Sequence, residues 1–175
     1  MPRLPYVEEG TSPAVDELYQ QIQRMGRPVL NLYQVLANQP PALGAFLEMS
    51  RYVRSASSLD GALRELAILA TARELQQEYE VAHHSEAAAR VGVPSAKLQA
   101  VVSGTSLEPL TPAERVAVEY ARQAAHTRSC DDATFQRLRS LFSKEEIVDL
   151  VVTTGWYHLC GVILSSLQVE LEAGE

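Results

Sequence analysis

The chain has 175 residues, 46% of them apolar and 21% charged, and its 22 acidic and 15 basic side chains give a formal net charge of −7. This length and composition predict one folded domain over residues 1–175 and exclude a disordered linker, because disordered chains are poor in the apolar residues that build a core. The acidic balance argues against nucleic acid or an anionic membrane surface as a partner, because both attract basic patches.

The cysteines and the N-terminal residues bear on the cellular location. Cys130 and Cys160 are the only cysteines, and their spacing fits no disulfide scaffold, redox pair or metal motif. Residues 1–10 lack the basic and then apolar layout of a signal peptide. We therefore expect reduced thiols and a cytoplasmic location.

Proline and glycine divide the sequence into segments of helical length. Residues 42–93 and 113–175 contain no proline, so both stretches can form long helices. Helix starts are indicated where Ser12 precedes Pro13, and where Thr111 and Ser143 each stand three residues before a glutamate, as in a capping box. Helix ends are indicated by the glycines that follow apolar-periodic segments, namely Gly26, Gly92 and Gly104.

These signals predict an all-helical chain. The predicted helices cover residues 13–25, 30–37, 41–55, 60–75, 77–91, 95–103, 112–127, 131–141 and 144–170. No segment alternates apolar and polar residues as a half-buried strand does. The predicted fold class is therefore all-α, a single-domain helical bundle, with frayed ends at residues 1–11 and 172–175.

Residues 150–169 contain no charged side chain and are long enough to span a membrane. The segment also contains polar side chains, namely Thr153, Thr154, His158, Ser165, Ser166 and Gln168. We therefore expect a helix that is buried in the core or in a subunit contact, and no membrane partner.

Glu65 is the first side chain suited to chemistry. At about 100° per residue it lies on the same helix side as Ile68, Leu69 and Ala72, which sets a carboxylate into an apolar face. Such a glutamate is either a structural residue paired with an arginine or part of a site, and this helix alone favours neither interpretation.

The next predicted helix adds Gln77, Glu80 and His84 on one side, at positions i, i+3 and i+7. The i,i+4 spacing of Glu80 and His84 lets the carboxylate contact and orient the imidazole. His83 points about 100° away, so the two adjacent histidines cannot both face one site. A single buried histidine is more often structural, but polar residues that converge from two successive helices favour a site.

Other patterns are weaker. Glu80 and His83 form an E-x-x-H sequence, half of a di-iron motif, but the second copy is absent from the sequence. Trp156, Tyr157 and His158 could line a pocket, although aromatic residues at helical spacing are more often part of a core. The sequence has no phosphate-binding glycine loop, nucleophile elbow or H-E-x-x-H zinc motif.

The runs LRELAIL at residues 63–69 and EYEVAHH at residues 78–84, followed by Ala88 and Gly92, resemble the carboxymuconolactone decarboxylase and alkylhydroperoxidase D-like family. The resemblance is best over residues 40–104. It implies an all-helical fold and assembly into homo-oligomers, commonly trimers or hexamers. It also implies a site between the two motif helices, often near a subunit contact.

The redox branch of this family has the spacing E-x11-C-x2-C-x3-H. Glu65 and His84 match its glutamate and histidine, but Gln77 and Glu80 stand at the cysteine positions, with Tyr79 between them. Neither residue can form a sulfenate or a disulfide, so we predict that thiol peroxidase activity is absent. The resemblance is instead to the decarboxylase branch, which does without these cysteines.

The leading hypothesis is a cofactor-free and metal-free lyase, a decarboxylase that acts on a small carboxylated lactone or a similar unsaturated acid. Decarboxylation leaves an electron pair that must delocalise onto a carbonyl oxygen before a carbon atom is protonated. We expect His84 to be the general acid, oriented by Glu80 and Glu65. The residues expected to bind the substrate are Gln77, Tyr79 and Arg73, with Arg64 as an alternative to Arg73 for its carboxylate.

Two alternatives stay open at this point. Glu65, Glu80 and His84 could instead be the ligands of a divalent metal in a metal-dependent enzyme. The chain could also be a non-catalytic oligomer whose pocket binds a ligand.

Overall fold

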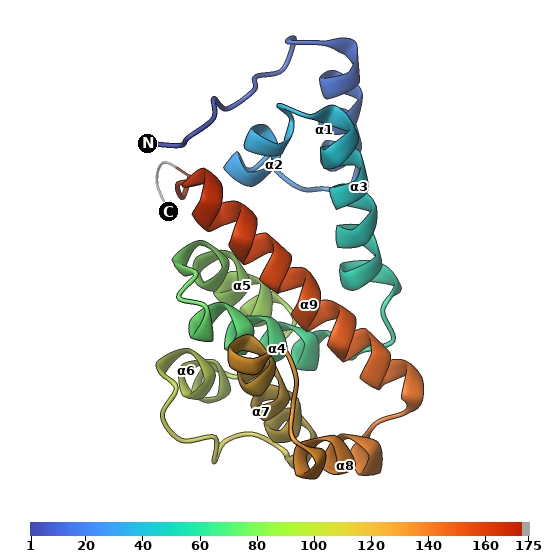
Figure 1. Cartoon of the computed structure of the whole chain (residues 1–175), viewed down its shortest axis with the longest axis vertical. Coiled ribbons are helices and arrows are strands. Elements are labelled where there is room, and N and C mark those ends of the chain that lie inside the picture. Colours follow the sequence, from blue (N-terminus) through green and yellow to red (C-terminus); the bar gives the residue numbers. More distant parts are fainter. Residues whose placement is uncertain (173–175) are drawn as a thin grey trace. The chain divides into compact units, whose positions relative to one another are not determined.

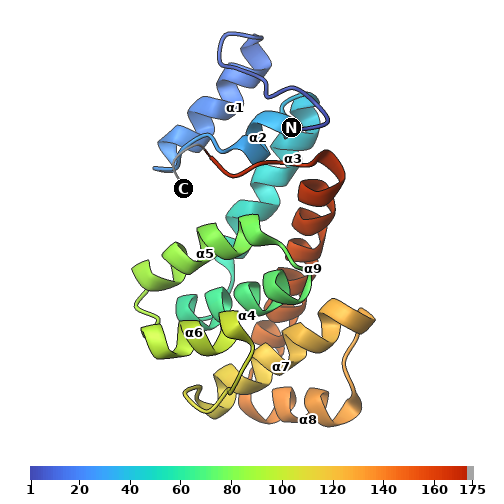
Figure 2. The same ribbon diagram turned by 90° about the vertical axis from the view of Figure 1, so that its left-hand side faces the viewer.

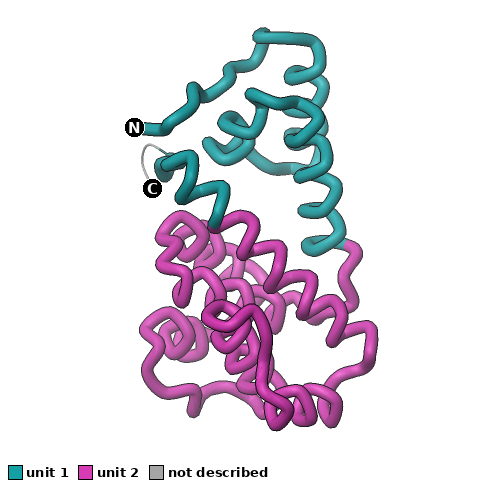
Figure 3. The backbone as a smooth tube through the Cα atoms, in the orientation of Figure 1, with its two compact units in different colours: residues 1–55, 162–175 teal, residues 56–161 magenta. Residues whose placement is uncertain are grey.

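The computed structural model describes residues 1–172, and in this range all regular secondary structure is helical (Figure 1, Figure 2). Nine α-helices and one π-helical turn form its regular structure, and residues 1–172 contain no strand, which confirms the predicted all-α fold class. The backbone forms two compact units, residues 1–55 with 162–175 and residues 56–161 (Figure 3). A single domain over residues 1–175 stays a prediction.

The unit of residues 1–55 and 162–175 contains the first three helices. They are α1 (Pro13–Arg24), α2 (Asn31–Leu36) and α3 (Pro40–Arg51). The Ser12 hydroxyl accepts a hydrogen bond from the Val15 N–H at 3.3 Å, which caps α1 as the sequence predicts. α1 packs on α3, and the rings of Tyr33 and Phe46 join α2 to α3 in an edge-to-face contact.

Two predictions for this part of the chain need correction. The helix expected over residues 41–55 is α-helical only to Arg51 and continues as the π-helical turn η1 (Tyr52–Ala56), a local widening that apolar periodicity does not signal. The N-terminal residues, expected to fray, are held by backbone and side-chain hydrogen bonds. The Arg3 N–H donates to the Leu167 carbonyl at 2.9 Å.

The fraying predicted at the C-terminus falls mostly outside the described residues. Residues 173–175 are not among them. Glu172 is, and its carboxylate accepts a hydrogen bond from the Asn31 N–H at 2.7 Å.

The unit of residues 56–161 is built around α4. Its helices are α4 (Gly61–Glu74), α5 (Glu78–Arg90), α6 (Ser95–Ser103), α7 (Pro112–Thr127), α8 (Asp132–Leu141) and α9 (Lys144–Leu167) as far as Gly161. α4 packs against α5, α6 and α7, and every residue from 66 to 72 is buried. A helix that is surrounded by its neighbours also buries its polar side chains. Glu65, which directly precedes this buried run, is itself buried.

Most helix ends in this unit follow the sequence signals. The Thr111 hydroxyl accepts from the Glu114 N–H at 3.3 Å, and the Glu114 carboxylate accepts from the Thr111 N–H at 2.8 Å. Ser143 and Glu146 exchange the equivalent pair of hydrogen bonds. Gly92 and Gly104 adopt the left-handed backbone conformation, with φ angles of 84° and 71°. The predicted capping boxes and glycine ends are therefore confirmed.

The turn between α4 and α5 has no glycine signal, yet it ends α4 in the same way. Gln76 is left-handed with φ of 55°, its N–H donates to the Arg73 carbonyl at 3.0 Å, and the Gln77 N–H donates to the Ala72 carbonyl at 2.8 Å. These two bonds form a Schellman motif. The chain reverses here, so that α5 packs on α4.

α9 is long and apolar enough to cross a membrane by length and composition alone. In residues 144–161, however, one side of the helix faces the protein interior. Ile147 and Leu150 belong to the apolar core of this unit, and Thr153, Tyr157 and Cys160 are buried. These contacts support the prediction of a core helix for this part of the uncharged segment.

The two leucines of α8 provide a matched test of the core. Leu138 is fully buried and Leu141 is 46% exposed. We expect Leu138→Ala to lower the free energy of unfolding by about 2–5 kcal/mol, because it removes core contacts and leaves a cavity. Leu141→Ala should change it by no more than about 0.5 kcal/mol. Urea denaturation measures both values, and equal losses would contradict this placement of α8.

Candidate active site

His84 and Glu65 form a buried hydrogen bond between α5 and α4. The Nδ1 atom of His84 lies 2.6 Å from Oε2 of Glu65, and the two side chains are 1% and 4% exposed. The Schellman turn at Gln76 makes this contact possible, because it returns the chain along α4 and brings position 84 beside position 65. The pair therefore links two helices through their polar groups.

Glu80 approaches the same imidazole through its other nitrogen. Oε2 of Glu80 lies 3.3 Å from Nε2 of His84, and His84 follows Glu80 by one turn of α5. The Glu80 side chain is also buried. The structure thus brings together the three residues expected to carry the chemistry, Glu65, Glu80 and His84. We call them the Glu–His–Glu triad.

The triad holds a proton in the protein interior. An ionised carboxylate can only accept hydrogen bonds, so a bare ring nitrogen beside it would bring two lone pairs together. Each of the two contacts therefore needs a proton between its heavy atoms, carried either by the imidazole or by the carboxyl group.

Arg64 and Tyr157 also reach the triad. Nε of Arg64 lies 3.8 Å from Oε1 of Glu65, and this guanidinium nitrogen is buried without a hydrogen bond in residues 1–172. The Tyr157 ring, from α9, meets the His84 ring edge-on with centroids 4.8 Å apart. The sequence analysis named Tyr157 as a possible pocket residue but did not connect it to His84, because the periodicity of α9 does not say which helix its buried side faces.

Gln77 and Tyr79 lie on the same stretch of α5 but make different contacts. Gln77 precedes Glu80 by one turn and packs on Gly161 of α9, where an added Cβ would be 3.4 Å from its Cγ. Its amide also donates to the Leu75 carbonyl at 3.4 Å. Tyr79 is buried and its ring stacks on His83, with centroids 4.6 Å apart. His83 therefore turns away from His84, as the helical spacing indicates.

Arg73 is not placed with the triad. Its Nε donates to the Val102 carbonyl at 3.1 Å, Nη2 donates to the Ser103 carbonyl at 3.3 Å, and Nη1 pairs with Glu74 at 2.6 Å. Arg73 therefore caps the end of α6. It also stands eight residues after Glu65, about 12 Å along the helix axis. Arg73 therefore lies away from the triad, whereas the alternative, Arg64, lies beside it, and which arginine binds a substrate carboxylate stays a prediction.

The triad does not have the arrangement of a metal centre. A histidine ligand must present a lone pair to the metal, whereas both ring nitrogens of His84 face carboxylate oxygens. Within residues 1–172, no group of three or more His, Cys, Asp or Glu side chains has the geometry to hold a metal ion. The donor set therefore fits proton chemistry better than metal binding.

Comparison with known families agrees with the motif residues. The model of the carboxymuconolactone decarboxylase family matches residues 40–123, which include all of α4 and α5. This segment belongs to the carboxymuconolactone decarboxylase family. A search of curated proteins gave no significant match.

Solved structures of similar fold include two peroxidase-related proteins and a debrominase. A peroxidase-related protein from Silicibacter sp. TM1040 has a TM-score of 0.85 at 18% identity, covering 98% of this chain and 92% of its own. A peroxidase-related protein from Ralstonia eutropha JMP134, described as an alkylhydroperoxidase AhpD core, has a TM-score of 0.86 at 20% identity. The match covers 98% of this chain and 93% of that protein. The debrominase Bmp8 has a TM-score of 0.79 at 18% identity, and the match covers 95% of this chain and 90% of Bmp8. At these identities the likeness establishes the alkylhydroperoxidase D-like fold alone.

Removing His84 should destabilise the protein. His84→Ala leaves two buried carboxylates beside each other without the imidazole, and breaking a buried ion pair typically costs about 3–5 kcal/mol of unfolding free energy. His83→Ala is the matched control, because it removes a half-buried ring next in the chain, and we expect it to cost about 1 kcal/mol or less. Equal losses in urea denaturation would contradict the ion pairs assigned to His84.

Proposed function

We propose that the protein is a cofactor-free lyase that decarboxylates a small carboxylated lactone or a similar unsaturated acid. The observation that carries the proposal is the buried Glu–His–Glu triad, in which an imidazole is fixed between two carboxylates. The motif helices α4 and α5, which lie in the family-matched segment, hold all three residues. A buried proton donor of this kind suits general acid catalysis.

The chemistry requires one proton and no electron acceptor. The bond between the substrate carbon and its carboxylate breaks, CO2 leaves, and the electron pair delocalises onto the conjugated carbonyl as an enolate. His84 then donates a proton to carbon and is reprotonated from water. Glu65 holds the ring through Nδ1 at 2.6 Å, so the Nε2 proton, in the longer contact of 3.3 Å with Glu80, is the one released.

Two further residues have proposed roles around the triad. The amide of Gln77 donates a hydrogen bond to the developing enolate oxygen. Arg64 binds the substrate carboxylate, because its guanidinium lies beside Glu65 of the triad. A planar guanidinium can donate two parallel hydrogen bonds to a carboxylate.

Thiol peroxidase activity is not expected. The cysteine positions of the redox branch hold Gln77 and Glu80, and the cysteines of this chain stand elsewhere, at 130 and 160. Burial, followed by the charges of Asp131 and Asp132, raises the pKa of the Cys130 thiol, so little thiolate forms at neutral pH. Cys160 is buried in α9.

Release of CO2 from a panel of carboxylated lactones and β-keto acids tests the proposal. We expect at least one of these compounds to be turned over. His84→Ala should lower kcat by about 10²- to 10⁴-fold, the usual contribution of a general acid. His83→Ala should stay within about two-fold of the wild type, because His83 faces Tyr79.

Two results would contradict this function. Full turnover by His84→Ala would remove His84 as the acid. If no compound of the panel released CO2 but one of them raised Tm strongly, the result would favour a non-catalytic ligand-binding protein instead.

We also propose that the protein acts as a homo-oligomer, a trimer or hexamer as the family resemblance implies. α9 supports this, because Val148 and Leu159 are 57% and 47% exposed and lie on one side of the helix. Exposed apolar residues gathered in this way are typical of subunit contacts.

A charge on this side of α9 should weaken the assembly. We expect Leu159→Lys to shift the mass measured by light scattering toward the monomer, because it would bury a charge in the contact. Val91→Lys, at an equally exposed valine beyond α5, should leave the mass unchanged. A wild-type protein that is monomeric at micromolar concentration would contradict the proposed oligomer.

A further inference from the structure

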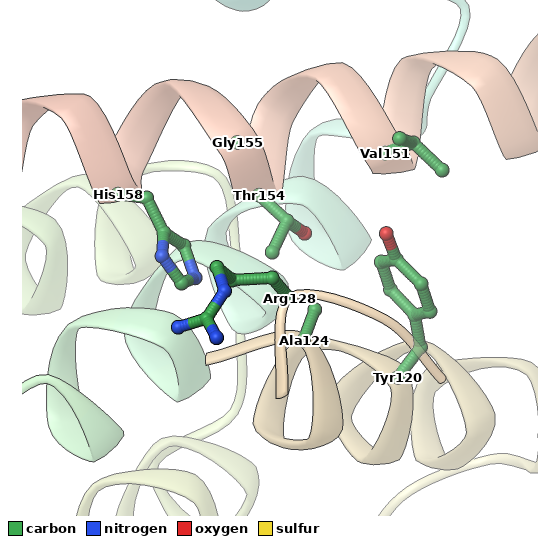
Figure 4. Close-up of a pocket in the computed structure, with 7 residues that line it drawn as sticks. All are labelled: Tyr120, Ala124, Arg128, Val151, Thr154, Gly155 and His158. Carbon is green, nitrogen blue, oxygen red and sulfur yellow. The ribbon is translucent and has the colours of Figure 1, made fainter. Parts of the chain in front are cut away.

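A cavity of about 300 Å³ lies between α7 and α9 in the unit of residues 56–161 (Figure 4). Ala124, Val151 and Gly155 supply apolar parts of its wall. None of the triad residues lines it, so it is separate from the candidate active site. Cavities that bind small molecules begin at about this volume.

Two polar side chains of α9 face this cavity without a partner. Thr154 is 2% exposed, and within residues 1–172 its hydroxyl makes no hydrogen bond. His158, one turn later, has a buried Nε2 atom that also lacks a partner in this range. Figure 4 shows both side chains directed from α9 toward α7. Buried polar groups are nearly always hydrogen-bonded, so this pair calls for a partner from outside the chain.

The Arg128 side chain supplies a positive charge on the opposite wall of the cavity. Arg128 follows α7 in a left-handed conformation, with φ of 61°, and in Figure 4 its guanidinium lies next to the His158 ring. In the described part of the chain this guanidinium forms no ion pair or hydrogen bond, and no carboxylate lines the cavity. A ligand would therefore meet one uncompensated positive charge.

The other titratable groups of the wall are neutral at pH 7. Burial, and then the charge of Arg128, lowers the pKa of His158, which keeps its imidazole uncharged. Burial, and then Cys130, raises the pKa of Tyr120 to about 12, so its hydroxyl remains protonated and can donate. Figure 4 shows that hydroxyl directed toward α9. The cavity thus combines one cation, three neutral hydrogen-bonding groups and apolar walls.

We propose that this cavity is a second ligand site, which binds a small organic monocarboxylate with an apolar body. The Arg128 fork can hold the carboxylate bidentately, and Thr154, His158 and Tyr120 supply the remaining hydrogen bonds. One cation matches one negative charge, whereas a phosphate dianion would keep an unbalanced charge and an amine would be repelled. The inference does not depend on the proposed decarboxylation, since the two sites share no residue.

Binding of benzoate to the full-length protein in its native assembly tests the site. Benzoate is a planar monocarboxylate small enough for the cavity, and benzamide is its uncharged counterpart. We expect saturable benzoate binding with a dissociation constant in the millimolar range, as for a fragment-sized ligand. Benzamide should bind at least ten-fold more weakly. The imidazole signals of His158 in NMR spectra should shift during the benzoate titration.

Matched variants locate the binding. Arg128→Gln, at an exposed position, should weaken benzoate binding at least ten-fold, and Thr154→Val, which keeps the shape of the side chain, about three- to ten-fold. Arg139→Gln changes an exposed arginine of α8 that does not line the cavity, and it should have no effect. Benzoate binding should persist in His84→Ala, because His84 does not line the cavity.

Three results would overturn the second site. One is the absence of saturable binding at tens of millimolar benzoate, including the case in which a second copy of the chain closes the cavity. Another is equal affinity of wild type and Arg128→Gln. The third is loss of binding in His84→Ala but not in Arg128→Gln, which would assign benzoate to the triad.

Discussion

The hydrogen bond between Glu65 and His84 is the interaction on which the candidate site depends. It joins α4 and α5 at 2.6 Å in a region that excludes water, where an unpaired carboxylate would be costly. Glu65 is buried because α4 is enclosed by its neighbours, and His84 meets it because the turn at Gln76 reverses the chain. Fold and site therefore rest on the same two helices.

Two substitutions within one helical turn account for the proposed change of chemistry. Gln77 and Glu80 stand at the positions where the resemblance places the two cysteines of the redox branch, and neither side chain can form a sulfenate or a disulfide. Glu80 instead faces the second nitrogen of His84, which gives the imidazole a carboxylate on each side. In the proposed function, this arrangement supplies the proton that the substrate carbon takes up after CO2 has left.

The sequence predicts local features well and contacts between helices poorly. Caps such as Thr111 with Glu114, and the contact of Glu80 with His84, depend on residues within one turn, so spacing alone predicts them. The break between the helices predicted over residues 60–75 and 77–91 is confirmed, but the left-handed conformation of Gln76 was not predicted, because the residue is not glycine. The contact of Tyr157 with His84, and the placement of Arg64 rather than Arg73 beside the triad, depend on which helices pack together. Periodicity gives only the buried side of each helix, not its neighbour.

The proposed chemistry depends above all on the charge state of His84. In protein labelled with ¹⁵N-histidine, long-range proton–nitrogen correlations report whether each ring nitrogen carries a proton, and His84→Gln identifies the signals. The account predicts that at pH 7 both Nδ1 and Nε2 of His84 are protonated, with Glu65 and Glu80 as acceptors. A neutral ring with one bare nitrogen at this pH would contradict the proton-holding triad and the proposed role of His84 as general acid.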